Sequence, residues 1–240
     1  MKHQYVGDIN DYRKYALLRA LSAGGANKVG VCWMLTPDDG GADGNRRNYA
    51  KYQHCDPELF DVLTPTLDDT SLRRVSYIKE SGVIAGAAFH ADPLPPTAAE
   101  RVAYMAECRA KFTDTDVVFF DPDNGLAPPA TKPGQTTTLH VSLDEAAAFY
   151  ALGKSVLLYQ HRPKLQTWET LIASKSEQLR TAIPSAAIWA FWKADVAFFL
   201  LVHPESPARL AIAAFEACRL LDPAFVRGEY LGCRRDAPNN

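Results

Sequence analysis

The sequence lacks the features that define several large classes of protein. Its 240 residues include only five cysteines, which are scattered, with no CxxC pair and no accompanying histidine spacing. We therefore expect reduced thiols, and neither a disulfide framework nor a zinc or other metal site. The histidine that follows a predicted short strand over 83–89, His90, is interpreted as structural, which is the commoner role of a single histidine at a strand end.

Long apolar runs and a strong charge excess are also missing. No apolar stretch approaches the ~20 residues of a membrane span, and the polar first eleven residues predict no signal peptide. We expect a cytoplasmic protein without a membrane partner. The net charge of -2 gives no electrostatic indication of a nucleic-acid partner, although it says nothing about a local basic face. The phosphate-binding patterns GxxxxGK[ST] and GxGxxG are absent.

One stretch, residues 116–126, breaks from an apolar run into an acidic turn. The run Val117–Phe120 is β-branched and aromatic, which predicts a strand buried on both faces. The turn carries Asp121, Asp123 and Asn124 at the carboxyl end of this strand, where ligands bind in open α/β sheets. We interpret these three residues as the candidate catalytic group, although an acidic turn without a function has the same composition.

Two further polar loops are predicted at the same edge of the sheet. A buried strand over 29–35 opens into an acidic, glycine-rich loop with Asp38, Asp39 and Gly41, residue types that suit a small molecule or a metal. A strand over 155–159 leads to His161 and Arg162, the candidate substrate-binding residues. Because the crossover between parallel strands is right-handed, the carboxyl ends of these strands meet at one edge.

The order of the predicted elements indicates the fold class. Strands alternate with helices until two apolar segments, 186–192 and 196–202, which are too close in sequence for a parallel crossover and must pair antiparallel. We predict an α/β protein, a Rossmann-like three-layer sandwich whose mostly parallel sheet ends in an antiparallel hairpin. We expect one domain over residues 1–240, with 45–80 as a candidate helical insertion and the basic tail 227–235 in solvent.

The segment before the first predicted helix has two interpretations. Asn10 or Asp11 is a candidate N-cap, and the charged residues near it then form a solvated face. Alternatively, Gly7 lets the backbone approach a ligand, while Asp11 and Lys14, neighbours on a helix because they are three apart, hold polar groups of that ligand.

The terminal hairpin and three short motifs resemble class I S-adenosylmethionine-dependent methyltransferases, most nearly the bacterial large-subunit ribosomal RNA adenine methyltransferases. The first helix opens with G-x-x-x-D-x-x-K, the strand over 29–35 and its loop fall where that family binds its cofactor, and Asp121-Pro122 falls where it has Asp-Pro-Pro-Tyr. The resemblance implies that Asp121 orients the amine of a nucleic-acid or small-molecule substrate. It also implies that S-adenosylmethionine is the cofactor, bound by Gly7, Asp11, Lys14, Asp38, Asp39 and Gly41.

The sequence departs from this family in the acidic turn. Asp123 replaces the second proline, and Asn124 replaces the aromatic residue that stacks on a flipped base. The loop after the strand over 29–35 also lacks the glycine pattern expected around the cofactor.

Two alternatives therefore stay open. In the first, Asp121-Pro122-Asp123 resembles the Asp-x-Asp motif of haloacid-dehalogenase-type phosphatases. A metal-dependent phosphoesterase or nuclease would then bind Mg²⁺ through Asp121, Asp123 and the 38–39 carboxylates, with His161 or Arg162 at the phosphate. In the second, the chain is a non-catalytic ligand-binding protein of the same fold.

Overall fold

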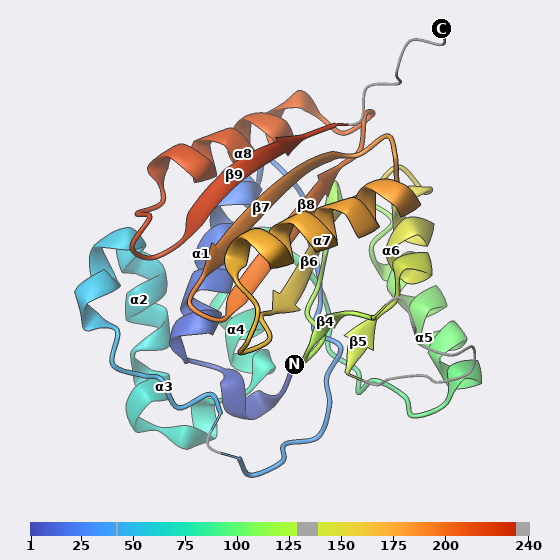
Figure 1. Ribbon diagram of the computed structural model, residues 1–240. Coiled ribbons are helices and arrows are strands. Elements are labelled where there is room, and N and C mark those ends of the chain that lie inside the picture. The colour runs from blue at the N-terminus through green and yellow to red at the C-terminus, as the bar shows by residue number, and fades with distance from the viewer. Residues whose placement is uncertain (42, 129–138, 234–240) are drawn as a thin grey trace, which may run out of the picture.

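A seven-stranded mixed sheet forms the centre of the protein, with helices on both faces (Figure 1). The computed structural model describes residues 1–41, 43–128 and 139–233. The predicted α/β, Rossmann-like architecture is confirmed. The strands of the sheet are β1 (Val29–Cys32), β2 (Ala88–His90), β3 (Val117–Phe120), β6 (Ser155–His161), β7 (Ala187–Lys193), β8 (Val196–Val202) and β9 (Arg227–Gly232).

The strands lie in the order β2-β1-β3-β6-β8-β7-β9. The first four are parallel to one another, whereas β8 is antiparallel to both β6 and β7. The predicted hairpin is confirmed, and its reversed strand lies inside the sheet, between β6 and β7. As a result β7 runs parallel to β6, and the β7–β8 turn lies at the same edge as the carboxyl ends of the parallel strands.

Residues 227–232 of the basic tail form β9 at the edge of the sheet, a strand that the sequence did not predict, and their charged residues Arg227 and Glu229 are exposed as expected. Tyr230 is the register partner of Trp189, and the two rings pack with centroids 4.6 Å apart. Gly228 lies against the ring of Phe191, where a Cβ atom would come within 2.8 Å of the nearest ring carbon. The segment pairs because aromatic contact and a close backbone approach outweigh its exposed charges.

Alternating residues of the strands serve two separate apolar cores. Val117 and Phe119 point into one core, while Val118 and Phe120 point into the other, as the period of two requires. Helices α1 (Ile9–Ser22) and α8 (Ala208–Leu220) cover the first face. Helices α5 (Ala98–Lys111), α6 (Leu143–Tyr150) and α7 (Trp168–Ala182) cover the second, which completes the three layers.

Short helices follow β1 and precede β2 in the chain: α2 (Pro57–Leu63), α3 (Pro65–Asp68) and α4 (Val75–Ser81), with 3₁₀ turns at Ala50–Cys55 and Thr70–Leu72. Further 3₁₀ turns are His3–Tyr5 and Ala23–Gly25, and β4 (Gly125–Leu126) pairs with β5 (His140–Val141) in a second, parallel ladder. That 45–80 is an insertion stays a prediction. Among the described residues, no helix combines the length and the apolar character that crossing a membrane requires.

Gly7 has a packing role that the sequence interpretation missed. Its φ of 84° lies in the left-handed region, and a Cβ atom there would lie 1.9 Å from Thr66 Oγ1. The close approach that requires glycine is therefore to the buried Thr66 of α3, and contact between the Gly7 backbone and a ligand stays a prediction.

This packing predicts different costs for two glycine-to-alanine substitutions. Gly7→Ala meets both an unfavourable φ and the Thr66 side chain, so we expect a loss of about 2–5 kcal/mol in the free energy of unfolding. Gly86→Ala is the matched control, because Gly86 has a φ of 66° but nothing within 4 Å of the new Cβ atom. Its expected loss is about 1–2 kcal/mol, and equal losses in urea unfolding would contradict the contact with Thr66.

Candidate functional site

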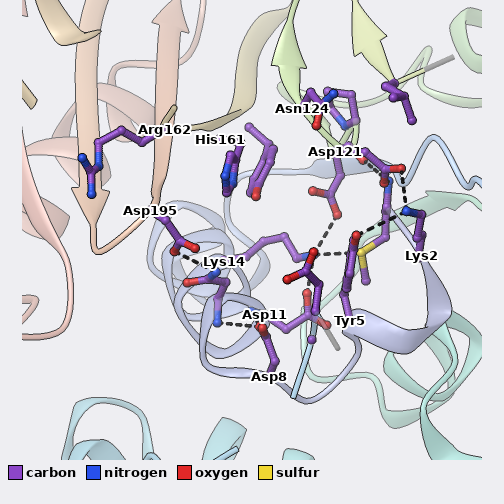
Figure 2. Close-up of a pocket in the computed structure, with 18 of the residues that line it drawn as sticks. Lys2, Tyr5, Asp8, Asp11, Lys14, Asp121, Asn124, His161, Arg162 and Asp195 are labelled. Atoms are coloured by element: carbon purple, nitrogen blue, oxygen red, sulfur yellow. Dashed lines mark hydrogen bonds and ion pairs between the residues drawn. The ribbon is translucent and has the colours of Figure 1, made fainter. Parts of the chain in front are cut away.

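A cavity of about 450 Å³ opens at the carboxyl edge of the parallel strands, above the amino end of α1. Figure 2 shows its polar side chains converging from α1, from the turn after β3 and from the end of β6. The lining is rich in aspartate, with basic residues interspersed. It consists of Met1, Lys2, Tyr5, Asp8, Asn10, Asp11, Lys14, Asp39, Asp43, Gly44, Arg46, Asp121, Pro122, Asp123, Asn124, Leu139, Tyr159, His161, Arg162, Lys164 and Asp195.

The floor of the cavity begins at Asp8, which caps α1. Its carboxylate accepts hydrogen bonds from the backbone N–H groups of Asn10 and Asp11, two donors that have no partner inside the helix. The cap is therefore Asp8, and not Asn10 or Asp11 as the sequence predicted. Burial raises the pKa of Asp8, and the helix N–H groups and Arg46 only partly oppose this.

A buried ammonium group joins the helix to the acidic turn. Lys14 Nζ lies 2.5 Å from Asp11 Oδ1 and 2.7 Å from Asp121 Oδ2, and each of the three side chains is at most 4% exposed. Burial lowers the pKa of Lys14, but the charges of Asp11 and Asp121 outweigh it and raise the pKa well above its usual value. Lys14 is therefore a fixed positive charge, held between two carboxylates.

Asp11 keeps one oxygen for a further contact. Its Oδ2 is buried and forms no hydrogen bond with any atom of the described residues, although the side chain lines the cavity. Burial raises the pKa of Asp11 to about 7, Lys14 opposes the rise, and Asp8 and Asp121 add to it. A buried carboxylate oxygen without a partner costs free energy, and a ligand that donates a hydrogen bond would recover it.

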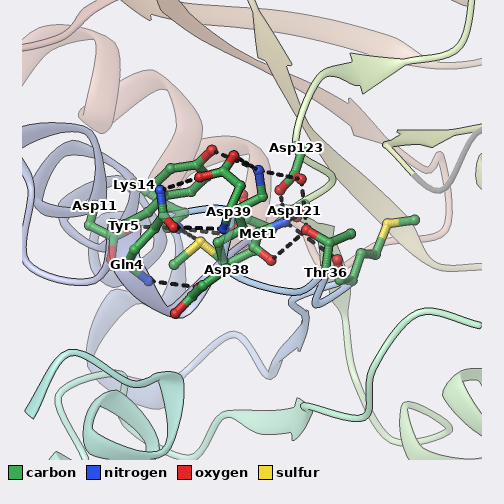
Figure 3. A network of polar contacts seen from close by, with 12 residues as sticks. Met1, Gln4, Tyr5, Asp11, Lys14, Thr36, Asp38, Asp39, Asp121 and Asp123 are labelled. Carbon is green, nitrogen blue, oxygen red and sulfur yellow. Dashed lines mark hydrogen bonds and ion pairs between the residues drawn. The ribbon is translucent and has the colours of Figure 1, made fainter. Parts of the chain in front are cut away.

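The acidic loop after β1 lines one side of the cavity, and Figure 3 shows its contacts with the first residues of the chain. Asp39 accepts hydrogen bonds from Lys2 and Gln4, and Asp38 accepts one from the backbone of Gln4. The hydrogen bond from Lys2 is the main reason that the pKa of Asp39 is lowered. Its carboxylate is half-exposed, so it is an ionised acceptor at the cavity wall.

The turn after β3 is fixed by contacts on both sides. Asp123 accepts a 2.7 Å hydrogen bond from the Thr36 hydroxyl, and its other oxygen lies 2.6 Å from the amino group of Met1. The Asn124 carbonyl accepts hydrogen bonds from the His161 backbone N–H and the Gln160 side chain. Asn124 itself is exposed at the cavity wall.

The opposite wall comes from the end of β6 and the β7–β8 turn. The Arg162 backbone N–H donates to the Asp195 carbonyl at 2.7 Å, and its guanidinium lies 4.9 Å from the ring centroid of Trp168. The Asp195 carboxylate accepts from Asn10 and Arg46.

The structure brings most of the predicted site residues together. Eight of them line the cavity: Asp11, Lys14, Asp39, Asp121, Asp123, Asn124, His161 and Arg162. Three predicted residues, Gly7, Asp38 and Gly41, do not line it. The sequence interpretation missed Asp8 and Asp195. The position of Asp195 could have been inferred from topology, because the turn after β7 must lie at this edge once β7 is parallel to β6.

The carboxylates do not form a metal-binding group. Where the structure describes the chain, three sets of histidine, cysteine or acidic side chains have their ligand atoms within 4.8 Å of one another, and none contains a carboxylate of this cavity. Asp121 and Asp123 are instead paired with cations. The geometry therefore does not favour the Mg²⁺-dependent alternative.

Comparison with known proteins adds little. No protein-family profile matches the chain, and no curated protein matches it. Among solved structures, human Methyltransferase-like protein 13 in complex with SAH is similar at 16% identity and a TM-score of 0.35, over 88% of this chain and 89% of that one. At this level of similarity we infer nothing about the chain from the match.

The buried ammonium predicts a large effect for Lys14→Met. Removing it leaves two buried carboxylates without their cation, so we expect a loss of about 3–5 kcal/mol in the free energy of unfolding. Arg219→Met is the matched control, since Arg219 and Glu216 form an ion pair with the same three-residue spacing on an exposed helix face. The unfolding midpoint of Arg219→Met in urea should hardly change. If both variants lost the same free energy of unfolding, the account of Lys14 as a buried ion-pair partner would be contradicted.

The raised pKa of Asp11 predicts a pH dependence of stability. Between its ordinary value of 3.8 and about 7, Asp11 is protonated in the folded chain and ionised in the unfolded one. The folded state then holds the extra proton, so this contribution falls as pH rises through that range, by up to about 1.4 kcal/mol per pH unit. The measurement is the difference in unfolding free energy between wild type and Asp11→Asn across the range. A difference that is constant with pH would contradict the shift.

Proposed function

We propose that this chain is an S-adenosylmethionine-dependent methyltransferase that acts on an amine of a nucleic-acid base. The observation that carries the proposal is the reversed strand β8, inserted between the parallel strands β6 and β7. This arrangement resembles the sheet of class I methyltransferases, with β9 as an addition. The cavity lies at the carboxyl edge of that sheet, the general ligand position in open α/β folds.

The donors and acceptors of the cavity suit this cofactor. S-adenosylmethionine carries an ammonium and a sulfonium group, and it presents ribose hydroxyls that donate hydrogen bonds. Asp11 offers a buried oxygen without a partner among the described residues, and Asp39 offers an ionised carboxylate. The same aspartates would repel a phosphorylated ligand. A volume of about 450 Å³ is within the usual range for cofactor pockets.

In this proposal, Asp11 accepts from the ammonium group of the cofactor and Asp39 from its hydroxyls. Lys14 is a positioning residue, since it fixes Asp11 and Asp121 relative to each other. When bound, the cofactor supplies a methyl group on sulfonium to an attacking nitrogen. The Pro122 carbonyl and the exposed Asn124 side chain accept hydrogen bonds from the substrate amine and orient its lone pair. Asp123, whose two oxygens are paired with Thr36 and the Met1 amino group, holds this turn in place, and the proton of the methylated nitrogen leaves to solvent.

Two features of the lining support a nucleic-acid base as the substrate. Tyr5 and Tyr159 are aromatic lining residues, and they offer the stacking surface that Asn124 lacks. Arg46 and Lys164 are exposed lining residues, and with Arg162 they provide cations for a phosphate backbone outside the acidic interior.

Calorimetry with S-adenosylhomocysteine, the demethylated product, tests the cofactor site. We expect saturable binding of one molecule per chain. Asp11→Asn keeps the size of the side chain but removes its charge, so we expect the affinity to fall by about 10–100-fold. The matched control is Asp116→Asn, because Asp116 precedes β3 at its opposite end and pairs with Arg209. Its affinity should equal that of the wild type.

Absence of binding by the wild type would overturn the proposal. Transfer of labelled methyl groups into RNA or DNA tests the substrate class, and label in a small molecule or in protein alone would contradict a nucleic-acid substrate. Binding without any transfer would favour a non-catalytic ligand-binding protein. Cleavage of a phosphoester that depends on Mg²⁺ would favour the hydrolase.

A further inference from the structure

A second cluster of reactive side chains lies under α5, on the other face of the sheet from α1. Cys32 ends β1 and His90 ends β2, and the two residues are register partners on parallel strands. Their side chains therefore project from the same face. Cys108 reaches them from α5, and the ligand atoms of the three residues lie within 4.8 Å of one another. Each of the three residues is at most 1% exposed.

The two nitrogens of the buried His90 imidazole lack hydrogen bonds in the described part of the chain. Neither nitrogen makes a hydrogen bond with an atom of the described residues. Its Nε2 lies 3.5 Å from a carboxylate oxygen of Asp92, which is too long and too poorly aligned for a hydrogen bond. Each buried polar atom without a hydrogen bond lowers the stability of the fold by about 1–3 kcal/mol. Both ring nitrogens are therefore left without a hydrogen-bond partner among the described residues.

The separation of the two sulfur atoms excludes a disulfide and fits either a hydrogen bond between two thiols or a shared metal ion. Cys32 Sγ and Cys108 Sγ are 3.6 Å apart. A disulfide requires about 2.05 Å, whereas two thiolates bound to one tetrahedral zinc ion at about 2.3 Å lie about 3.8 Å apart. The observed spacing is close to the second value.

We propose that Cys32, Cys108 and His90 bind one Zn²⁺ ion. Both thiols give up their protons to solvent on binding, and neutral imidazole supplies the third ligand. With Nε2 turned toward Asp92, Nδ1 is the nitrogen that faces the metal, and Asp92 accepts the N–H of the ring, an arrangement common around zinc-bound histidines. Three protein ligands leave the fourth position to an oxygen ligand such as water.

The ion would join β1 to β2 and α5, two consecutive elements that come much later in the chain. It would hold α5 against β1 and β2, next to the cavity, because the Asp121 backbone N–H donates to the Cys32 carbonyl. The role is structural and does not depend on the proposed methyl transfer. The proposal reverses the expectation from the sequence, where the cysteines appear unrelated because their spacing along the chain has no recognisable pattern.

Cobalt is the probe for this site, since Co²⁺ takes tetrahedral thiolate sites and gives thiolate-to-metal charge-transfer absorption. Adding Co²⁺ to the reduced wild-type protein should produce this absorption, saturating at one ion per chain, and Zn²⁺ should remove it. Cys108→Ser and His90→Gln should weaken binding by at least about tenfold, and Zn²⁺ should raise the melting temperature of the wild type but not of His90→Gln. Circular dichroism checks that the variants fold.

Cys55→Ser is the control, because Cys55 belongs to a partly exposed group with His54 and Asp222 that also has metal-ligand spacing. This variant should retain the cobalt absorption. Wild-type protein without such absorption would overturn the proposal whether or not any variant folds. Cobalt absorption that is lost in Cys55→Ser but kept in Cys108→Ser would also overturn it. A Cys32–Cys108 disulfide, with no cobalt binding after its reduction, would assign the pair to redox chemistry instead.

Discussion

The ammonium of Lys14 between two buried carboxylates is the interaction on which the site depends. It links α1 to the turn after β3, across 107 positions of the chain between Lys14 and Asp121. Charged groups out of water are tolerable only if each is paired, so the helix and the turn hold each other in one relative position. The free oxygen of Asp11 is a consequence of this arrangement, because one cation cannot satisfy four carboxylate oxygens.

Much of the fold was predictable because its signals are local. The apolar run Val117–Phe120 had to be a buried strand, and the short spacing between 186–192 and 196–202 had to give a hairpin. The location of the candidate cavity followed from the rule that parallel strands end at one edge. Residues 227–232 were missed as β9, because their strand formation depends on contact with Trp189 and Phe191 rather than on their own composition.

The remaining errors concern contacts between distant segments. Gly7 matched a ligand-binding pattern, yet its glycine is required by Thr66, which no local pattern indicates. Cys32, His90 and Cys108 appeared unrelated until two strands and a helix brought them together. Spacing along the chain identifies a metal site only when its ligands lie on one or two adjacent elements. The unpaired polar atoms of Asp11 and His90 are likewise visible only in three dimensions, and the two proposed binding sites rest on them.

The most direct test of the methyltransferase proposal is a crystal structure of the protein grown with S-adenosylhomocysteine. The account predicts the ligand in the cavity between α1, the acidic loop and the turn after β3, with its amino group on Asp11 and its sulfur directed toward Asn124. A ligand bound elsewhere, or a divalent ion on Asp121 and Asp123 in the same cavity, would contradict it.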